Sequence, residues 1–151
     1  MSKAFTRESD DELEQRPPLE PWPAGLKYYV TPHGHAALRA LYEQMRAGGH
    51  TNDARAAALL QRLEAAEVID PATQPRDRVL FGATVTVEDE AGAQKRWRVV
   101  GVDEAEPARG WVSWRSPIAR ALINLRVGEA ATLRTPAGVQ ELTVVRIEYE
   151  E

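Results

Sequence analysis

The sequence lacks several residue types and patterns, and each absence excludes a class of protein. None of its 151 residues is cysteine, which excludes a disulfide framework, a thiolate metal site and a cysteine nucleophile. No apolar run is as long as a membrane-spanning helix, and the first residues hold no apolar core of a secretory signal. Positive charge is not in excess either, because the net charge is −4. We therefore expect a cytoplasmic protein that makes no membrane contact and meets nucleic acid only through a local patch or a protein partner.

The residues that are present predict a globular chain with three segments. Hydrophobic residues make up 43% and charged residues 28%, which is typical of soluble domains. Residues 1–27 are acidic and proline-rich, and they contain too little apolar surface to offset the entropy of ordering. We predict a disordered tail there, followed by a helical hairpin over 28–75 and a sheet domain over 76–151.

Helical signals dominate the second segment. Thr31 is a suitable N-cap with Pro32 in the first turn, and a glycine turn separates arms at Pro32–Ala47 and Asn52–Val68. Equal arms joined by a short turn predict an antiparallel helical hairpin, a short coiled coil. The apolar stripes that would meet between the arms are Leu38, Leu41, Tyr42 and Met45 on the first, and Ala56, Leu59, Leu60, Leu63 and Ala66 on the second.

Period-two alternation replaces helical spacing after residue 76. Ser116 and Pro117 are suited to begin one short helix, to Asn124, among the strands. This pattern predicts an α+β domain with an antiparallel sheet. The expected strands are Val79–Phe81, Ala83–Val87, Gln94–Val102, Trp111–Trp114, Ala131–Thr135 and Val139–Tyr149.

Local motifs also occur in a specific order and together cover most of residues 28–150. That order resembles the Gre family of transcript cleavage and elongation factors (GreA/GreB), and it is closer to GreB. The matching motifs are Tyr29–Pro32, Ala66–Asp70, Val79–Ala83, Arg98–Glu104, Ser116–Leu122, Val127–Glu129 and Thr135–Gly138.

The resemblance implies a fold, a partner and a division of labour. Residues 76–151 would be FKBP-like and would dock on the rim of the RNA polymerase secondary channel, while the hairpin enters the channel. Acids at the hairpin tip of the family help to hold the catalytic Mg²⁺ of the polymerase, so the chemistry belongs to the polymerase. We expect a monomer that is not an enzyme, binds no metal or cofactor of its own, and meets the RNA or DNA of the elongation complex indirectly. The docking loop would comprise Ser116, Pro117, Ile118, Ala119 and Arg120, with Arg115 beside it.

Two departures from the family pattern bear on function. Both arms are short, and losing about two heptads from each would withdraw the tip by ~21 Å. The only carboxylate at the turn is Asp53, whose simpler interpretation is a helix cap. We therefore expect inefficient stimulation of transcript cleavage. At the docking loop, Arg115 stands where the family often has an acid, a reversal that can weaken or redirect docking.

Three alternatives stay open from the sequence. The chain could stimulate cleavage if Asp53 reaches the polymerase Mg²⁺. Arg55 and Arg62, seven residues apart, could contact RNA or the channel wall, although a solvated helix face is the plainer interpretation. A peptide-binding or prolyl isomerase module is the third alternative, and it would need an aromatic-lined pocket.

Overall fold

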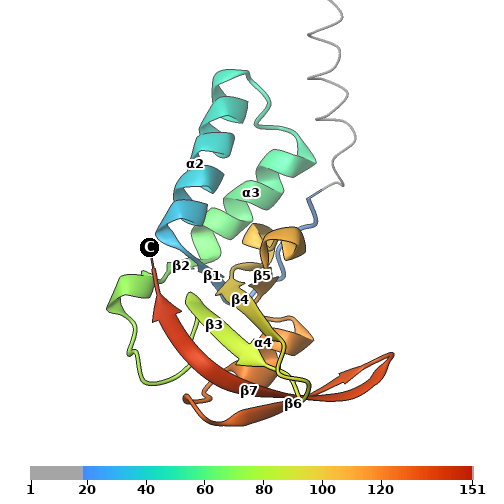
Figure 1. Cartoon of the computed structure of the whole chain (residues 1–151). Coiled ribbons are helices and arrows are strands. Elements are labelled where there is room, and N and C mark those ends of the chain that lie inside the picture. Colours follow the sequence, from blue (N-terminus) through green and yellow to red (C-terminus); the bar gives the residue numbers. More distant parts are fainter. Residues whose placement is uncertain (1–18, 151) are drawn as a thin grey trace, which may run out of the picture.

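The computed structural model describes residues 19–150, in which a helical hairpin stands on a five-stranded sheet (Figure 1). Helix α2 (Pro32–Ala47) begins at Thr31, whose side-chain oxygen accepts the Gly34 N–H at 3.1 Å. Helix α3 (Ala54–Ala65) begins at Asp53, which caps it in the same way. Gly49 turns the chain between them with φ +76°, a conformation that favours glycine. The predicted antiparallel hairpin is confirmed.

The second arm differs from its prediction at two places. Helix α3 ends at Ala65, and the next residues form strand β2 (Ala66–Val68), which pairs in parallel with β1 (Tyr28–Val30). The β-branched Val68 and the approaching Asp70-Pro71 favour extended backbone there. Leu60 is 39% exposed instead of lying in the apolar stripe, because α3 buries Ala58 and Arg62 on a neighbouring face.

Residues 19–27 pack against this face, so the prediction of a disordered tail over 1–27 is wrong for its last nine residues. Trp22 is 8% exposed and meets Tyr28 edge-on, with ring centroids 4.9 Å apart. With Val30, these aromatic rings build a small second core that offsets the entropy of ordering the segment. Residues 1–18, with the acidic run, lie outside the described residues.

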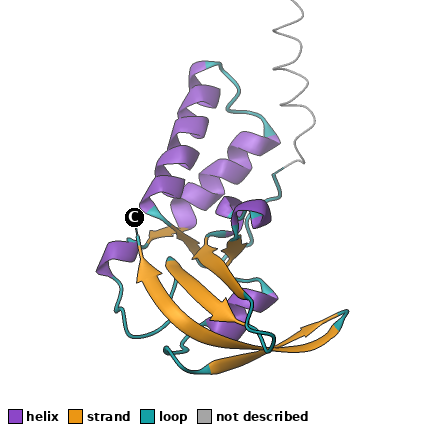
Figure 2. Ribbon diagram, in the orientation of Figure 1, coloured by secondary structure: helices purple, strands orange, loops and turns teal. Residues whose placement is uncertain are grey.

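The sheet domain carries the larger core. Its strand order is β5-β4-β3-β7-β6, and every pairing is antiparallel except that of β4 with β5. Helix α4 (Pro117–Leu122) packs on one face of the sheet, where Ala119 and Leu122 join the core (Figure 2). The α+β class is therefore confirmed, with one parallel edge in the predicted antiparallel sheet. The strands are β3 (Ala83–Glu88), β4 (Gln94–Val100), β5 (Trp111–Ser113), β6 (Ala130–Thr135) and β7 (Gly138–Tyr149).

Three 3₁₀ turns, η1 (Pro71–Thr73), η2 (Val102–Glu104) and η3 (Pro107–Arg109), connect these elements. The strand predicted at Val79–Phe81 is not formed. Val79 instead exchanges backbone hydrogen bonds with the segment that follows α4, at 2.9 Å to the Leu125 carbonyl and 2.8 Å from the Asn124 N–H. Gly82, with φ +90°, then turns the chain into β3.

Candidate functional site

The predicted docking residues form a loop only at Arg115 and Ser116, which follow β5, because Pro117, Ile118, Ala119 and Arg120 belong to the first turns of α4. Ser116 holds the backbone at this junction. The Ser116 hydroxyl accepts the Ala119 N–H at 3.3 Å and donates to the Ser113 carbonyl at 2.7 Å. These bonds present Pro117 and Arg120 to solvent and leave Ile118 half-buried. Ala119 has no exposed surface, so it supports the loop from the core and does not contact a partner. The predicted loop residues are thus brought together, with that one correction.

The exposed part of the loop is basic. Arg115 and Arg120 are both exposed, and neither side chain forms an ion pair within residues 19–150. Within the described part of the chain, Arg115 donates its backbone N–H to the Ser113 hydroxyl at 3.1 Å. Two guanidinium groups therefore lie on either side of Pro117 along the chain, and the loop is suited to an acidic or polar partner surface.

The hairpin tip carries a single carboxylate with a structural role. Asp53 is exposed, and its Oδ1 accepts the backbone N–H of Arg55 at 2.9 Å. Nowhere in residues 19–150 do three or more histidine, cysteine or acidic side chains gather as metal ligands would. The tip thus presents one carboxylate oxygen engaged in capping and one left to accept other donors.

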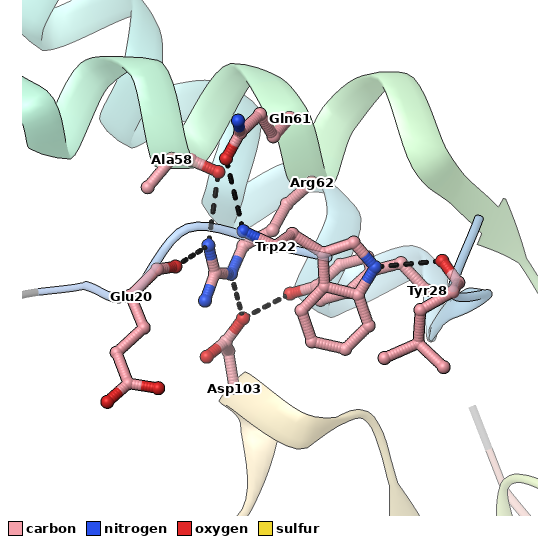
Figure 3. Close-up of polar contacts among 8 residues, drawn as sticks. Glu20, Trp22, Tyr28, Ala58, Gln61, Arg62 and Asp103 are labelled. Atoms are coloured by element: carbon pink, nitrogen blue, oxygen red, sulfur yellow. Dashed lines mark hydrogen bonds and ion pairs between the residues drawn. The ribbon is translucent and has the colours of Figure 1, made fainter. Parts of the chain in front are cut away.

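Arg62 lies at the base of the hairpin and is not available to nucleic acid. It is 4% exposed, and its Nε forms an ion pair with Oδ2 of Asp103 at 2.6 Å (Figure 3). Its Nη1 donates to the carbonyls of Glu20, at 2.7 Å, and Ala58, at 3.1 Å. The prediction of a channel contact at Arg62 is therefore wrong, because residues 19–27 cover the face that the helical pattern leaves open.

Two neighbouring acids of η2, Asp103 and Glu104, bind the residues at the base of the hairpin. The sequence analysis gave them no role beyond membership in a family motif. Asp103 also accepts the Tyr28 hydroxyl at 2.7 Å, and burial together with this hydrogen bond raises the pKa of Tyr28. Glu104 accepts the N–H of Thr31 at 3.3 Å, the Thr31 hydroxyl, and the N–H of Gly101 at 2.8 Å. One sequence feature could have indicated this cluster. It is Trp22, a large aromatic residue within an otherwise polar, proline-rich segment.

A cavity of about 420 Å³ opens between the start of α2 and the edge of the sheet. Its aromatic wall is Trp111, and the guanidinium of Arg98 lies 5.2 Å from the centre of that ring. A ring already covered by a cation offers little to a proline side chain, so this cavity does not favour the isomerase alternative.

No helix within residues 19–150 combines the length and the apolar character needed to cross a membrane.

Comparison with known proteins places the chain in a family. Residues 74–149 match the family model described as "Transcription elongation factor, GreA/GreB, C-term". The chain is 35% identical over 156 residues to GreA of Psychrobacter sp. strain PRwf-1, covering 82% of this chain and 99% of that protein. It is 40% identical over 99 residues to GreB of Pasteurella multocida strain Pm70, covering 66% of this chain and 63% of that protein, less than two thirds of its length.

Among solved structures, the prokaryotic transcription elongation factor GreA/GreB from Nitrosomonas europaea is 23% identical. The aligned region covers 82% of this protein and 100% of the Nitrosomonas europaea chain, with a TM-score of 0.46. The family match and the GreA relative confirm the resemblance read from the motifs. The chain belongs to the GreA/GreB family of transcription elongation factors.

Proposed function

We propose that this protein regulates transcription elongation by binding bacterial RNA polymerase at the rim of its secondary channel. The sheet domain is the docking module, and the hairpin points into the channel mouth. Family membership supports polymerase as the partner. The exposed side chains of Pro117 and Arg120 support α4 and the loop before it as the contact. The protein itself carries out no chemistry and acts through the polymerase.

The observation that carries the regulatory assignment is the short hairpin. The 16 residues of α2 span only ~24 Å at about 1.5 Å per residue. The match to GreA extends over 156 residues, whereas 82% of the 151-residue chain is about 124 residues, so about 32 positions have no counterpart here. A loss of that size equals about two heptads from each arm. The tip carboxylate would then lie much farther from the polymerase Mg²⁺ than the ~2 Å of a metal–ligand bond.

The chemistry of the tip supports the same conclusion. Asp53 stands alone as an acid at the turn, and its carboxylate caps α3. One engaged carboxylate is a weak partner for Mg²⁺, which takes several oxygen ligands. The docked protein therefore does not stimulate cleavage efficiently. It competes for the secondary channel with cleavage-competent factors and with other proteins that enter there.

The test is RNA cleavage in a stalled, backtracked elongation complex, at a concentration where binding to polymerase is confirmed by co-migration. We expect no acceleration by this protein, and a loss of the acceleration given by a full-length GreB added in competition. Faster cleavage that disappears in an Asp53→Ala variant would instead establish a cleavage factor acting through Asp53. Absence of binding to polymerase would overturn the docking assignment.

A further inference from the structure

The base of the hairpin is held by contacts that neither the docking loop nor the tip uses. We propose that two features set the direction in which the hairpin leaves the sheet domain. One is the strap, residues 19–27, and the other is the latch, Asp103 and Glu104. Trp22 and Arg62 are the positioning residues. Only the consequence of this arrangement at the polymerase rests on the proposed function; the direction itself is a property of the free protein.

Arg62 connects three segments through one rigid group. Its guanidinium reaches Asp103 of the sheet domain, the carbonyl of Glu20 in the strap, and the carbonyl of Ala58 in its own helix (Figure 3). A guanidinium is planar and its donors diverge at fixed angles. All three bonds are therefore satisfied together in one orientation of α3, and tilting the helix breaks at least one of them.

Trp22, in the strap, packs against both Arg62 and Tyr28. Its ring lies 5.5 Å from the Arg62 guanidinium carbon and meets the Tyr28 ring edge-on. Its backbone N–H donates to Oε1 of Gln61 at 3.1 Å, and its indole N–H donates to the Leu26 carbonyl at 2.9 Å. The strap is thus bonded to α3 and folded on itself, so it limits the movement of that helix.

The latch holds the other arm independently. Glu104 accepts the backbone N–H and the hydroxyl of Thr31, the residue that begins α2, while Asp103 holds α3 through Arg62. Glu104 also packs directly against the first turn of α2, because a Cβ at Gly34 would collide with its Oε1. One attachment would allow the hairpin to swivel. Two attachments from adjacent residues of η2, one to each arm, define its direction.

The direction of the hairpin can be altered without unfolding the protein. A buried ion pair contributes little to stability compared with apolar side chains of the same volume, although it imposes geometry. Replacing Arg62, Asp103 and Tyr28 together by Met, Leu and Phe removes the charges and the hydroxyl at once, so no unpaired charge is buried. We expect this triple variant to fold, with its hairpin less well directed.

The absence of cysteine in the sequence makes the direction measurable. Cysteines introduced at His50, in the turn, and Thr132, on β6, carry spin labels for distance distributions by pulsed electron resonance. We expect one narrow distribution in the parent, and one about twofold broader in Trp22→Ala and in the triple variant. Arg39→Met, on the exposed face of α2, is the control that should stay narrow.

Equal widths in the parent, Trp22→Ala and the triple variant would overturn the inference. Circular dichroism confirms folding, and Tyr28→Phe, which removes one hydroxyl, supplies a milder variant if the others unfold. In the competition assay, we expect the broadened variants to bind polymerase through the intact docking loop but to block GreB about tenfold less well. A parent that fails to bind polymerase would refute the proposed function, while the distance distributions would still decide the inference.

Discussion

The guanidinium of Arg62 and the carboxylate of Asp103 lie 2.6 Å apart although 41 residues separate them in the chain. The Arg62 side chain is 5% exposed and that of Asp103 is 25% exposed, so the pair is shielded from solvent on the arginine side. An exposed pair of this kind contributes little, whereas a buried charge that loses its partner is strongly unfavourable. Removal of the Asp103 carboxylate should therefore lower the stability of the protein strongly, because Arg62 stays buried.

Replacing Asp103 by Ala should destabilise the protein by about 3–5 kcal/mol, because the buried guanidinium of Arg62 is left without its charge partner. Urea unfolding followed by tryptophan fluorescence measures the change. Asp53→Ala is the matched acid at the other end of the hairpin, and it should cost about 1 kcal/mol through loss of a helix cap. Similar losses in the two variants would contradict the dependence of the buried Arg62 guanidinium on Asp103.

Replacing Pro117 by Glu should abolish binding to RNA polymerase while the sheet domain stays folded. Pro117 is exposed in the first turn of α4, so a charge there disturbs the contact surface and leaves the core intact. Pull-down with core polymerase measures binding, and circular dichroism confirms the fold. Pro136→Glu, in the exposed turn between β6 and β7, is the control. Unchanged binding by the Pro117 variant would place the contact elsewhere.

If Arg115, in place of the acid frequent in the family, redirects docking toward an acidic surface of the partner, charge reversal at Arg115 and Arg120 should weaken polymerase binding by about tenfold or more. Both guanidinium groups are exposed, and no ion pair within residues 19–150 engages them. The double variant should also show a flatter dependence of affinity on salt, because fewer charges are screened. Arg134→Glu, an exposed arginine on β6, serves as the control and should behave as the parent. A salt dependence equal to that of the parent would show that these charges do not face the partner.

Stability should fall as the pH rises above about 10, where an unfolded tyrosine begins to ionise. Burial and the hydrogen bond to Asp103 raise the pKa of Tyr28 in the folded state. The folded state therefore keeps its proton when the unfolded state has lost it, so the contribution is complete below pH 10 and declines above it. Unfolding free energies between pH 8 and 11 should decline less steeply in Tyr28→Phe. Some slope should persist, because burial also raises the pKa of Tyr149.

Local signals predicted the elements that depend on neighbours in the chain. The cap at Thr31, the glycine turn and the alternation in Ala83–Val87 each act within a few residues, and the hairpin, the sheet and α4 formed as expected. Ser116 was likewise predicted as the cap of α4, and it is.

The errors arise where distant segments meet. Arg62 has the spacing of a solvated helix face, yet distant residues cover it, among them Trp22, 40 positions earlier, and Asp103, 41 positions later. Val79 has the composition of a strand residue, yet its backbone partners follow α4. The parallel pairing of β1 with β2 likewise joins segments that a whole helical hairpin separates. Such pairings depend on tertiary packing, which periodicity within one segment does not report.

The parallel pairing of β1 with β2 has one more consequence. The chain enters the hairpin along β1 and leaves it along β2 in the same direction and at the same level, with Tyr28 opposite Ala66 and Val30 opposite Val68. Matched insertions or deletions in the two arms would therefore leave this entrance and exit unchanged. How far the hairpin extends can then vary in evolution, or by protein engineering, without redesign of the domain that carries it.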